Sequence, residues 1–202
     1  MEQVDPPRAD SSRASRALED GELLRRVRDR REEALAELYD RYASLLLALA
    51  HRVLGEAGEA EEVLQEAFLQ VWNQAARYDP SRSSVSTWLI LITRSRAIDR
   101  LRTRRVEERT TSAAERENVA RHASPEAPQA VLRQDRRRRL QSELARLPPE
   151  QRQVLDLAFY GGMTQTEIAA ELDIPLGTVK TRTLLAMKKL RAALREEIRE
   201  LL

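Results

Sequence analysis

Apolar residues recur at helical spacing along most of the chain, and this pattern predicts helices rather than strands. A first helical stretch is expected between residues 22 and 54, before two glycines that favour a helix end, Gly55 and Gly58. Its apolar positions are Leu24, Val27, Leu35, Leu38, Tyr42, Leu45, Leu46 and Leu49. Because the alternation typical of strands is nearly absent, we expect an all-α protein without a sheet.

The most regular apolar stripe lies between residues 59 and 76 and predicts a helix with one buried face. Its members are Val63, Leu64, Ala67, Phe68, Val71, Trp72 and Ala75. The opposite face carries the polar residues Glu61, Glu62, Gln65, Glu66 and Asn73. Proline and serine predict a loop over residues 78–84, and a further helix is expected over residues 86–105.

Two polar segments indicate how the chain divides into domains. Residues 1–20 hold prolines and serines among mixed charges, and they are expected to form a disordered lead because they bury too little apolar surface to offset ordering. Residues 106–133 are also polar and irregular and are expected to be a flexible linker. We therefore predict two small helical domains, residues 21–105 and 134–202.

The second domain has the sequence pattern of a helix-turn-helix. Thr164 and Glu167 have the spacing of a capping box at the start of its first helix. Residues 173–175 supply a tight turn, and a second helix is expected from about residue 176 with Val179 facing inward. In such a motif the second helix places its side chains in the major groove of DNA.

Basic residues cluster on this predicted second helix, although the net charge of the chain is only +2. The three lysines of the chain, Lys180, Lys188 and Lys189, all lie on or beside it. Clustering of this kind marks a surface for phosphate. We expect Lys180 and Arg182 to contact bases or phosphates, with Thr181 next. The alternative is a helical hairpin whose basic face meets only solvent.

The sequence lacks the residue patterns of a disulfide, a metal site, a catalytic centre and a membrane span. The sequence has no cysteine, and its two histidines, His51 and His122, lie in different segments, so we expect no disulfide and no metal site. No glycine-rich phosphate loop and no nucleophile with a base is recognisable, so we expect neither a cofactor nor a catalytic centre. No apolar run is long enough to span a bilayer, and the first residues do not resemble a signal peptide. We expect a cytoplasmic protein.

Several segments resemble the extracytoplasmic-function (ECF) group of bacterial RNA polymerase sigma factors. Residues 147–155, 163–169 and 174–182 are similar to the promoter-reading C-terminal domain of that group. Residues 61–72 are similar to its polymerase-binding helix, and residues 78–102 are similar to its promoter-melting segment. The segments occur in the order and separation of the family, which makes the resemblance specific.

This resemblance implies a sigma factor that binds core RNA polymerase and promoter DNA. The duplex minus-thirty-five element would be contacted by Thr178, Lys180, Thr181, Arg182 and Lys188. The clamp helices of the largest polymerase subunit would meet Glu62, Gln65, Glu66 and Asn73, with the flap as a further polymerase contact. The opened minus-ten strand would be held by Tyr78, Ser83, Ser95, Arg96, Arg100 and Arg104. Family members are usually inhibited by an anti-sigma protein, often membrane-associated.

Three positions, in two segments, depart from the family pattern. Many members have asparagine where this chain has Ser95, so the capture of a minus-ten base is expected to differ in detail. Arginine or histidine often stands where this chain has Leu184 and Leu185, so the minus-thirty-five contacts are expected to be fewer or more apolar.

Other interpretations of the residues remain open at this point. The polar face of residues 61–73 also suits plain solvent exposure. The face that carries Arg96, Arg100 and Arg104 also suits solvent exposure with partial pairing to Asp99. A helix-turn-helix regulator with an N-terminal dimerisation or sensing domain is the main alternative for the whole chain. A recombinase with a C-terminal DNA reader is a more remote one, because the N-terminal half lacks a convincing nucleophile set.

Overall fold

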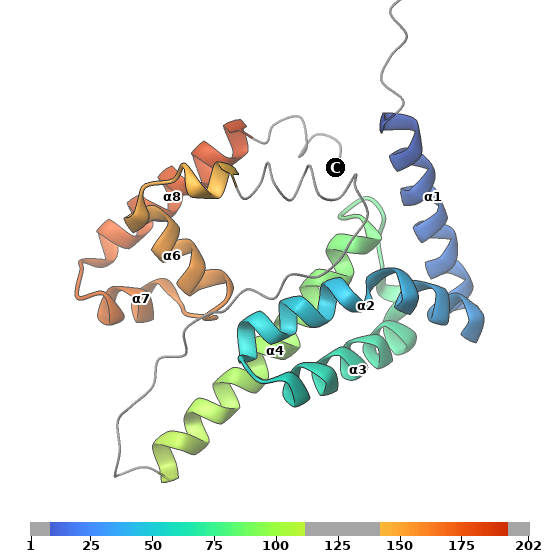
Figure 1. The fold of residues 1–202 in the computed structure, drawn as a ribbon, viewed down its shortest axis with the longest axis horizontal. Helices are drawn as coiled ribbons and strands as arrows, with labels where there is room; N and C mark the ends of the chain where they lie inside the picture. Colours follow the sequence, from blue (N-terminus) through green and yellow to red (C-terminus); the bar gives the residue numbers. More distant parts are fainter. Residues whose placement is uncertain (1–8, 112–141, 194–202) are drawn as a thin grey trace, which may run out of the picture. The chain divides into compact units, whose positions relative to one another are not determined.

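The structure is a computed structural model that describes residues 9–111 and 142–193. Its regular elements in these ranges are α1 (Ala9–Arg28), α2 (Glu32–Leu54), α3 (Ala57–Gln74), the 3-10 turn η1 (Ala75–Arg77), α4 (Val85–Thr111), α6 (Pro149–Phe159), α7 (Gln165–Glu171) and α8 (Leu176–Ala193) (Figure 1). Within these ranges no residue belongs to a strand. The prediction of an all-α protein is therefore confirmed.

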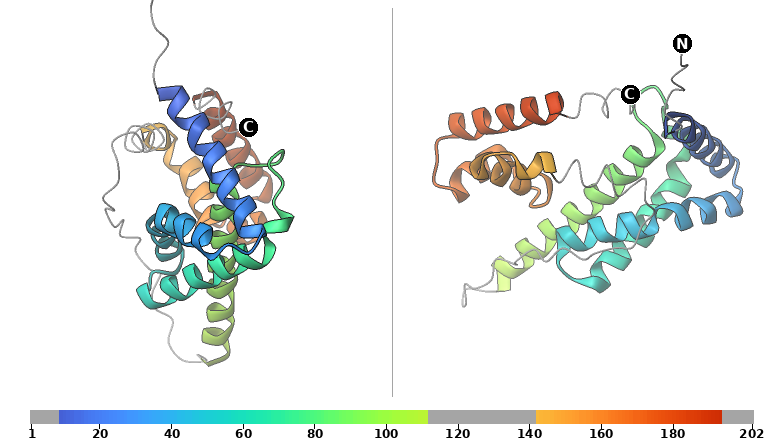
Figure 2. Two further views of the ribbon diagram at one scale, coloured as in Figure 1. Left: turned by 90° about the vertical axis from the view of Figure 1, so that its right-hand side faces the viewer. Right: turned by 45° about the horizontal axis from the view of Figure 1, so that its top comes forward.

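The chain divides into two compact units. Among the described residues, the first comprises residues 9–51 and 56–97, and the second comprises residues 52–55, 98–111 and 142–193. Figure 2 draws the helices of the first unit and the trio α6, α7 and α8 from two further sides.

The first unit is built around an aliphatic core to which all of its helices contribute. The apolar stripe predicted on α3 is buried as expected, except that Trp72 is only partly buried against the core. The fully assembled core consists of Leu23, Leu24, Val27, Ala34, Leu38, Tyr42, Leu46, Leu64, Ala67, Phe68, Val71, Ala75, Val85, Leu89 and Ile92. Burial of these side chains fixes which faces of α3 and α4 remain for other contacts.

A sharp break separates α1 from α2 where the sequence contains no glycine. Arg30 adopts a left-handed backbone with φ 62°, and its N–H donates to the carbonyl of Val27 at 2.9 Å. The guanidinium of Arg30 donates to the carbonyl of Trp72 at 3.2 Å and lies over the ring of that tryptophan. These contacts hold a conformation that is unusual for a residue with a Cβ.

The expected disordered lead is wrong for residues 9–20, because α1 begins at Ala9. Asp20 is buried on α1 and accepts hydrogen bonds from the hydroxyl of Tyr42 and from Arg41, the latter at 3.0 Å. These polar contacts and the burial of Leu24 anchor the helix, which then extends toward the N-terminus at little further cost because helix growth is cooperative. Residues 1–8 of the predicted lead lie outside the described residues.

The expected flexible linker is also wrong at its start, since α4 continues through Val106 to Thr111. Elongating an existing helix adds one hydrogen bond for each residue fixed, so a polar segment can remain helical after the core contacts have ended. Residues 112–133 of the predicted linker lie outside the described residues.

The second unit contains the predicted helix-turn-helix. Val154 of α6, Ile168 of α7 and Val179 of α8 are buried together and form its centre. α6 has Pro149 in its first turn, and the chain leaves this helix through Gly162 with φ 62°. The positive φ explains why a glycine stands at this position.

Candidate nucleic-acid and polymerase interfaces

The start of α7 is fixed by the predicted capping box. The hydroxyl of Thr164 accepts from the N–H of Glu167 at 3.2 Å, and the carboxylate of Glu167 accepts from the N–H of Thr164 at 2.6 Å. The hydrogen bond from the Thr164 backbone is the main cause that lowers the pKa of Glu167 below its usual value. The box holds the first helix of the motif in one orientation at its entry.

The turn between α7 and α8 is closed by backbone hydrogen bonds. Asp173 has φ 50°, a conformation that aspartate tolerates better than most residues. The N–H of Ile174 then donates to the carbonyl of Ala169 at 3.0 Å, and the N–H of Thr178 donates to that of Pro175 at 2.8 Å. The turn therefore sets the angle at which α8 leaves α7 and presents its outer face.

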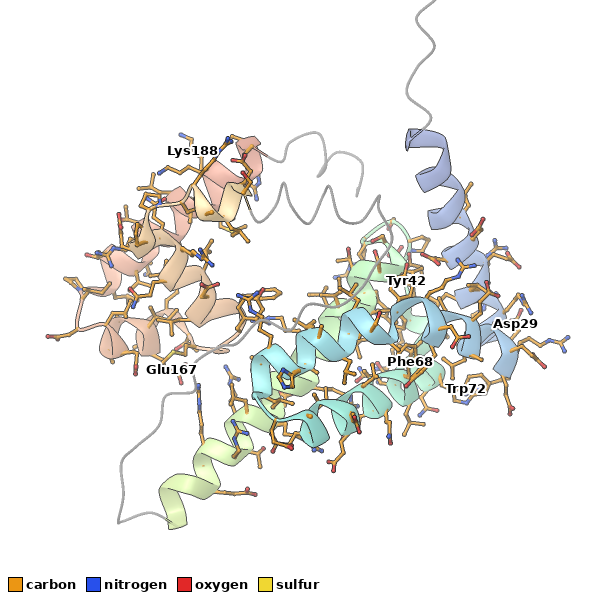
Figure 3. All side chains as sticks on the ribbon, in the orientation of Figure 1. Asp29, Tyr42, Phe68, Trp72, Glu167 and Lys188 are labelled. Atoms are coloured by element: carbon orange, nitrogen blue, oxygen red, sulfur yellow. The ribbon has the colours of Figure 1, made fainter. Side chains whose placement is uncertain are left out.

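The outer face of α8 is the side opposite the buried Val179 and Ala186. Gly177, Thr181, Leu184 and Lys188 form a column on this side because they are spaced by four, three and four residues. All four are exposed, as is the neighbouring Lys180. Figure 3 labels Lys188 on α8.

Two of the predicted minus-thirty-five residues lie at the margin of this face. Thr178 and Arg182 are only half-buried, whereas Lys180, Thr181 and Lys188 are exposed. α8 carries the basic residues Lys180, Arg182, Lys188, Lys189 and Arg191 and has no acidic residue over its 18 positions. The charged residues of this helix are therefore all positive, a composition that attracts anions.

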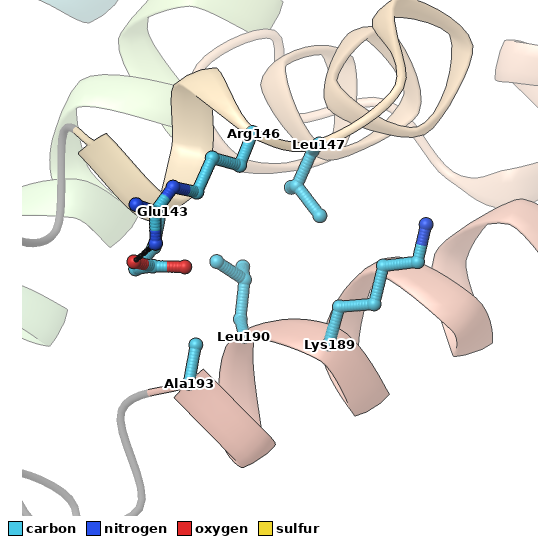
Figure 4. A pocket seen from close by; sticks show the side chains of 6 residues that line it. All are labelled: Glu143, Arg146, Leu147, Lys189, Leu190 and Ala193. Atoms are coloured by element: carbon cyan, nitrogen blue, oxygen red, sulfur yellow. Dashed lines mark hydrogen bonds and ion pairs between the residues drawn. The ribbon is translucent and has the colours of Figure 1, made fainter.

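Lys189 belongs to a different side of α8 from Lys188. It lines a small pocket together with Leu190, Ala193 and three residues from the segment before α6 (Figure 4). Those three residues are Glu143, Arg146 and Leu147. Arg146 forms an ion pair with Glu143 at 2.6 Å within this segment.

The outer face of α3 includes the predicted polymerase-binding residues. Glu62, Gln65 and Asn73 are exposed, and Glu66 is half-buried. Leu69 lies in the middle of this face, since it follows Glu62 by seven residues and precedes Asn73 by four, and it is 61% exposed. Sequence reasoning did not include Leu69, although its position opposite the predicted apolar stripe was a usable signal.

The loop between η1 and α4 is ordered by hydrogen bonds among its own residues. The hydroxyl of Tyr78 donates to the carbonyl of Ser83 at 2.8 Å, which joins two of the predicted minus-ten residues. The ring of Tyr78 packs on Trp88 with centroids 5.5 Å apart, and burial is the main cause that raises the pKa of Tyr78. Asp79 accepts from the N–H of Ser81 at 2.9 Å and completes a second turn within the loop.

The three arginines predicted along α4 do not form a free basic stripe. Arg96 donates through Nε to Gln70 at 2.7 Å and through Nη1 to Glu66 at 2.9 Å. Arg104 donates to the carbonyl of Leu54, the last residue of α2, at 3.1 Å. Arg100 is half-buried, and Ser95 is exposed. Arg96 therefore pairs with residues of α3, and not with Asp99 as the alternative interpretation had it.

Two other features are absent from the part of the chain that the structure describes. No group of three or more His, Cys, Asp or Glu residues there could hold a metal ion. No helix among the same residues is long and apolar enough to cross a membrane.

Two regions of the chain match family models of known proteins. Residues 38–107 match the family model of Sigma-70 region 2, and residues 137–190 match that of Sigma-70, region 4. The chain is 38% identical over 170 residues to the ECF RNA polymerase sigma factor RpoE of Cereibacter sphaeroides, which covers 84% of this chain and 91% of the relative. It is 36% identical over 172 residues to the ECF RNA polymerase sigma factor SigK of Mycobacterium tuberculosis. This alignment covers 85% of this chain and 91% of SigK.

The chain belongs to the ECF sigma factors. This sigma factor therefore directs RNA polymerase to promoters for the initiation of transcription. The alternative of a helix-turn-helix regulator with an N-terminal dimerisation or sensing domain is not favoured. Among solved structures it is similar to Rhodobacter sphaeroides SigE in complex with the anti-sigma ChrR, with 36% identity, a TM-score of 0.43, and coverage of 84% of this chain and 94% of that one.

Membership of the family places both surfaces of this sigma factor within matched regions. The outer face of α3 and the loop before α4 lie within the region 2 match. The outer face of α8 lies almost wholly within the region 4 match. Sigma factors are DNA-binding initiation factors without catalytic activity of their own.

Proposed function

We propose that this sigma factor divides promoter recognition between the outer face of α8 and the surfaces of α3, α4 and the intervening loop. The observation that carries the proposal is the acid-free, basic composition of α8 on the side opposite Val179. A polyanion is the complementary partner for such a surface, because each neutralised phosphate releases bound counterions.

For the minus-thirty-five element we propose contacts from the exposed residues of α8 first. Lys180, beside the column, and Lys188, at its C-terminal end, meet phosphates. Thr178 and Arg182, which are half-buried, contact the duplex from the margins of the face. The arrangement fits a helix whose first turns enter the major groove.

For core polymerase we propose the outer face of α3, with Leu69 as an apolar centre among polar neighbours. Glu62, Gln65, Glu66 and Asn73 surround Leu69 on this face. An apolar side chain inside a polar rim is the usual composition of a protein interface. The clamp helices of the largest subunit are the proposed partner, and the flap is the proposed partner of the second unit.

For the minus-ten element we propose capture of the opened strand at the loop held by Tyr78 and Ser83, with Ser95 exposed on α4. Arg96 and Arg104 donate hydrogen bonds to Glu66 and to the carbonyl of Leu54, so we assign to both the support of α4. Arg100, half-buried on the same helix, adds positive charge near the opened strand.

The proposal also covers the domain organisation, the inhibitor and the cellular location of the protein. The two matched regions, residues 38–107 and 137–190, act as separate domains tethered by the segment between them, and tethering raises the effective concentration of the second promoter contact. An anti-sigma protein that covers the polymerase-binding face acts as the inhibitor. The protein works in the cytoplasm as a non-enzymatic factor.

The proposal is tested with sigma-free core polymerase, the full chain and a promoter library. We expect specific start sites with the wild type and their loss with Lys180→Glu. A matched charge reversal at Arg25, an exposed residue of α1, should leave initiation unchanged. If the wild type gives no initiation above core polymerase alone, the proposal is wrong.

A further inference from the structure

The most exposed large apolar side chain of α8 is Leu184, and it stands at the centre of the basic outer face. Leu184 is 69% exposed, compared with 42% for Leu185 and 44% for Met187. Leu185 and Met187 lie on the flanks of the helix, whereas Leu184 falls in the same column as Thr181 and Lys188. A leucine at this position serves no packing function within the described part of the chain.

The charges around Leu184 favour DNA as its partner. Lys180 precedes it by four residues and Lys188 follows it by four, so both lysines neighbour it on the helix surface. Both are exposed, and the helix has no acidic residue. Two cations on either side of an apolar side chain suit a groove whose walls are phosphates and whose floor is formed by bases.

The column around Leu184 offers few hydrogen-bond donors to a base. Gly177 has no side chain, and the hydroxyl of Thr181 donates to the carbonyl of Gly177 at 2.9 Å. Thr181 therefore presents its methyl group and an acceptor oxygen beside Leu184. In the major groove the apolar group on a base edge is the C5-methyl group of thymine.

We propose that Leu184 reads one thymine of the minus-thirty-five element by van der Waals contact with its C5-methyl group. Lys180 and Lys188 bind phosphates and so set how deeply α8 enters the major groove. The methyl group of Thr181 packs beside the contact between Leu184 and the thymine methyl group. The inference rests on the proposed duplex contact of α8 and names the base that this contact selects.

The test uses the holoenzyme, made from core polymerase and the full chain, on a promoter fragment that the holoenzyme itself has selected. Each thymine of the minus-thirty-five element is replaced in turn by deoxyuridine, which removes one methyl group and nothing else. Binding is measured by competition. At one position we expect about a fourfold loss of affinity, the effect of leaving one methyl-sized group uncovered.

Leu184→Ala is measured on the same fragments. We expect about a fourfold loss on the unmodified promoter and no further loss on the fragment that carries deoxyuridine at the sensitive position. Leu185→Ala, a leucine of the same helix at its flank, should keep the deoxyuridine sensitivity of the wild type. Thermal melting of each variant checks that the exposed substitutions leave the fold unchanged.

Three results would overturn the inference. One is that no thymine is sensitive to loss of its methyl group, and another is that Leu184→Ala retains the sensitivity. The third is that Leu184→Ala weakens binding to core polymerase in the absence of promoter DNA, which would assign the side chain to a protein contact. If Lys180→Glu also leaves promoter binding intact, the duplex contact of α8 itself is wrong, and not only the role of Leu184.

Discussion

Arg96 of α4 donates a hydrogen bond to Glu66 of α3 at 2.9 Å. The contact joins a helix assigned to the minus-ten element to the helix assigned to core polymerase. Gln70, one turn further along α3, accepts a second hydrogen bond from the same guanidinium at 2.7 Å. The position of α4 against α3 thus depends partly on Arg96 and Glu66. The family resemblance assigns these two side chains to contacts with DNA and with core polymerase.

Removal of this link should weaken both stability and polymerase binding by a modest amount. The side chains of Arg96 and Glu66 are 36% and 41% exposed, so solvent screening limits their coupling to about 0.5 kcal/mol. A double-mutant cycle with Arg96→Ala and Glu66→Ala, measured by urea unfolding, gives this coupling. Additive effects of the two substitutions would contradict the link.

Leu69 should matter for polymerase binding without mattering for the fold. Because its side chain is 61% exposed, Leu69→Ala should change the free energy of unfolding by less than about 0.5 kcal/mol. The affinity of the Leu69→Ala variant for core polymerase should be about tenfold lower than that of the wild type, because the substitution removes the apolar centre of the interface. Leu18→Ala is the matched control, because Leu18 is exposed on α1 outside the proposed interface. Equal affinities for both variants would exclude Leu69 from the interface.

Each phosphate contact of α8 should appear in the salt dependence of promoter binding. Lys180→Ala and Lys188→Ala should each reduce the slope of log affinity against log salt concentration by about one. The measurement is a titration of holoenzyme with promoter DNA at several salt concentrations. Lys189→Ala provides the contrast, because Lys189 lines the pocket beside residues 143–147 and should leave the slope unchanged.

The capping box of α7 should make the second unit sensitive to acid. The lowered pKa of Glu167 means that its carboxylate stabilises the folded state above the usual pKa of 4.5, and that this contribution disappears as the pH falls through the lowered value. Glu167→Gln should flatten this part of the stability profile, and Thr164→Ala should cost about 1 kcal/mol at neutral pH. Circular dichroism between pH 7 and pH 3 measures both effects. An unchanged acid profile in Glu167→Gln would contradict the assignment.

The hydroxyl of Tyr42 should be required for the N-terminal helix. It donates to Asp20, which is buried, so Tyr42→Phe leaves one acceptor of that carboxylate without its partner. We expect a loss of about 1–3 kcal/mol in the free energy of unfolding. Tyr39→Phe serves as the control, since the ring of Tyr39 packs on Phe68 on the exposed side of α2. If the two variants are equally stable, the Asp20 contact does not anchor α1.

The sequence by itself determined the elements that depend on local spacing. The buried stripe of α3 and the inward position of Val179 follow from a repeat of about 3.6 residues, and the start of α7 follows from residues three apart in the chain. The family resemblance likewise rested on contiguous segments. Such features need no knowledge of distant neighbours, which explains why they were predictable.

Only the tertiary structure decided what depends on residues far apart in the chain. Asp20 lies 22 positions from Tyr42, and Arg96 lies 30 positions from Glu66. The first contact makes a polar segment helical, and the second gives a predicted DNA-binding arginine a protein partner. Neither could be deduced from periodicity, because the energy of a charged or polar side chain is set by the groups that folding brings next to it.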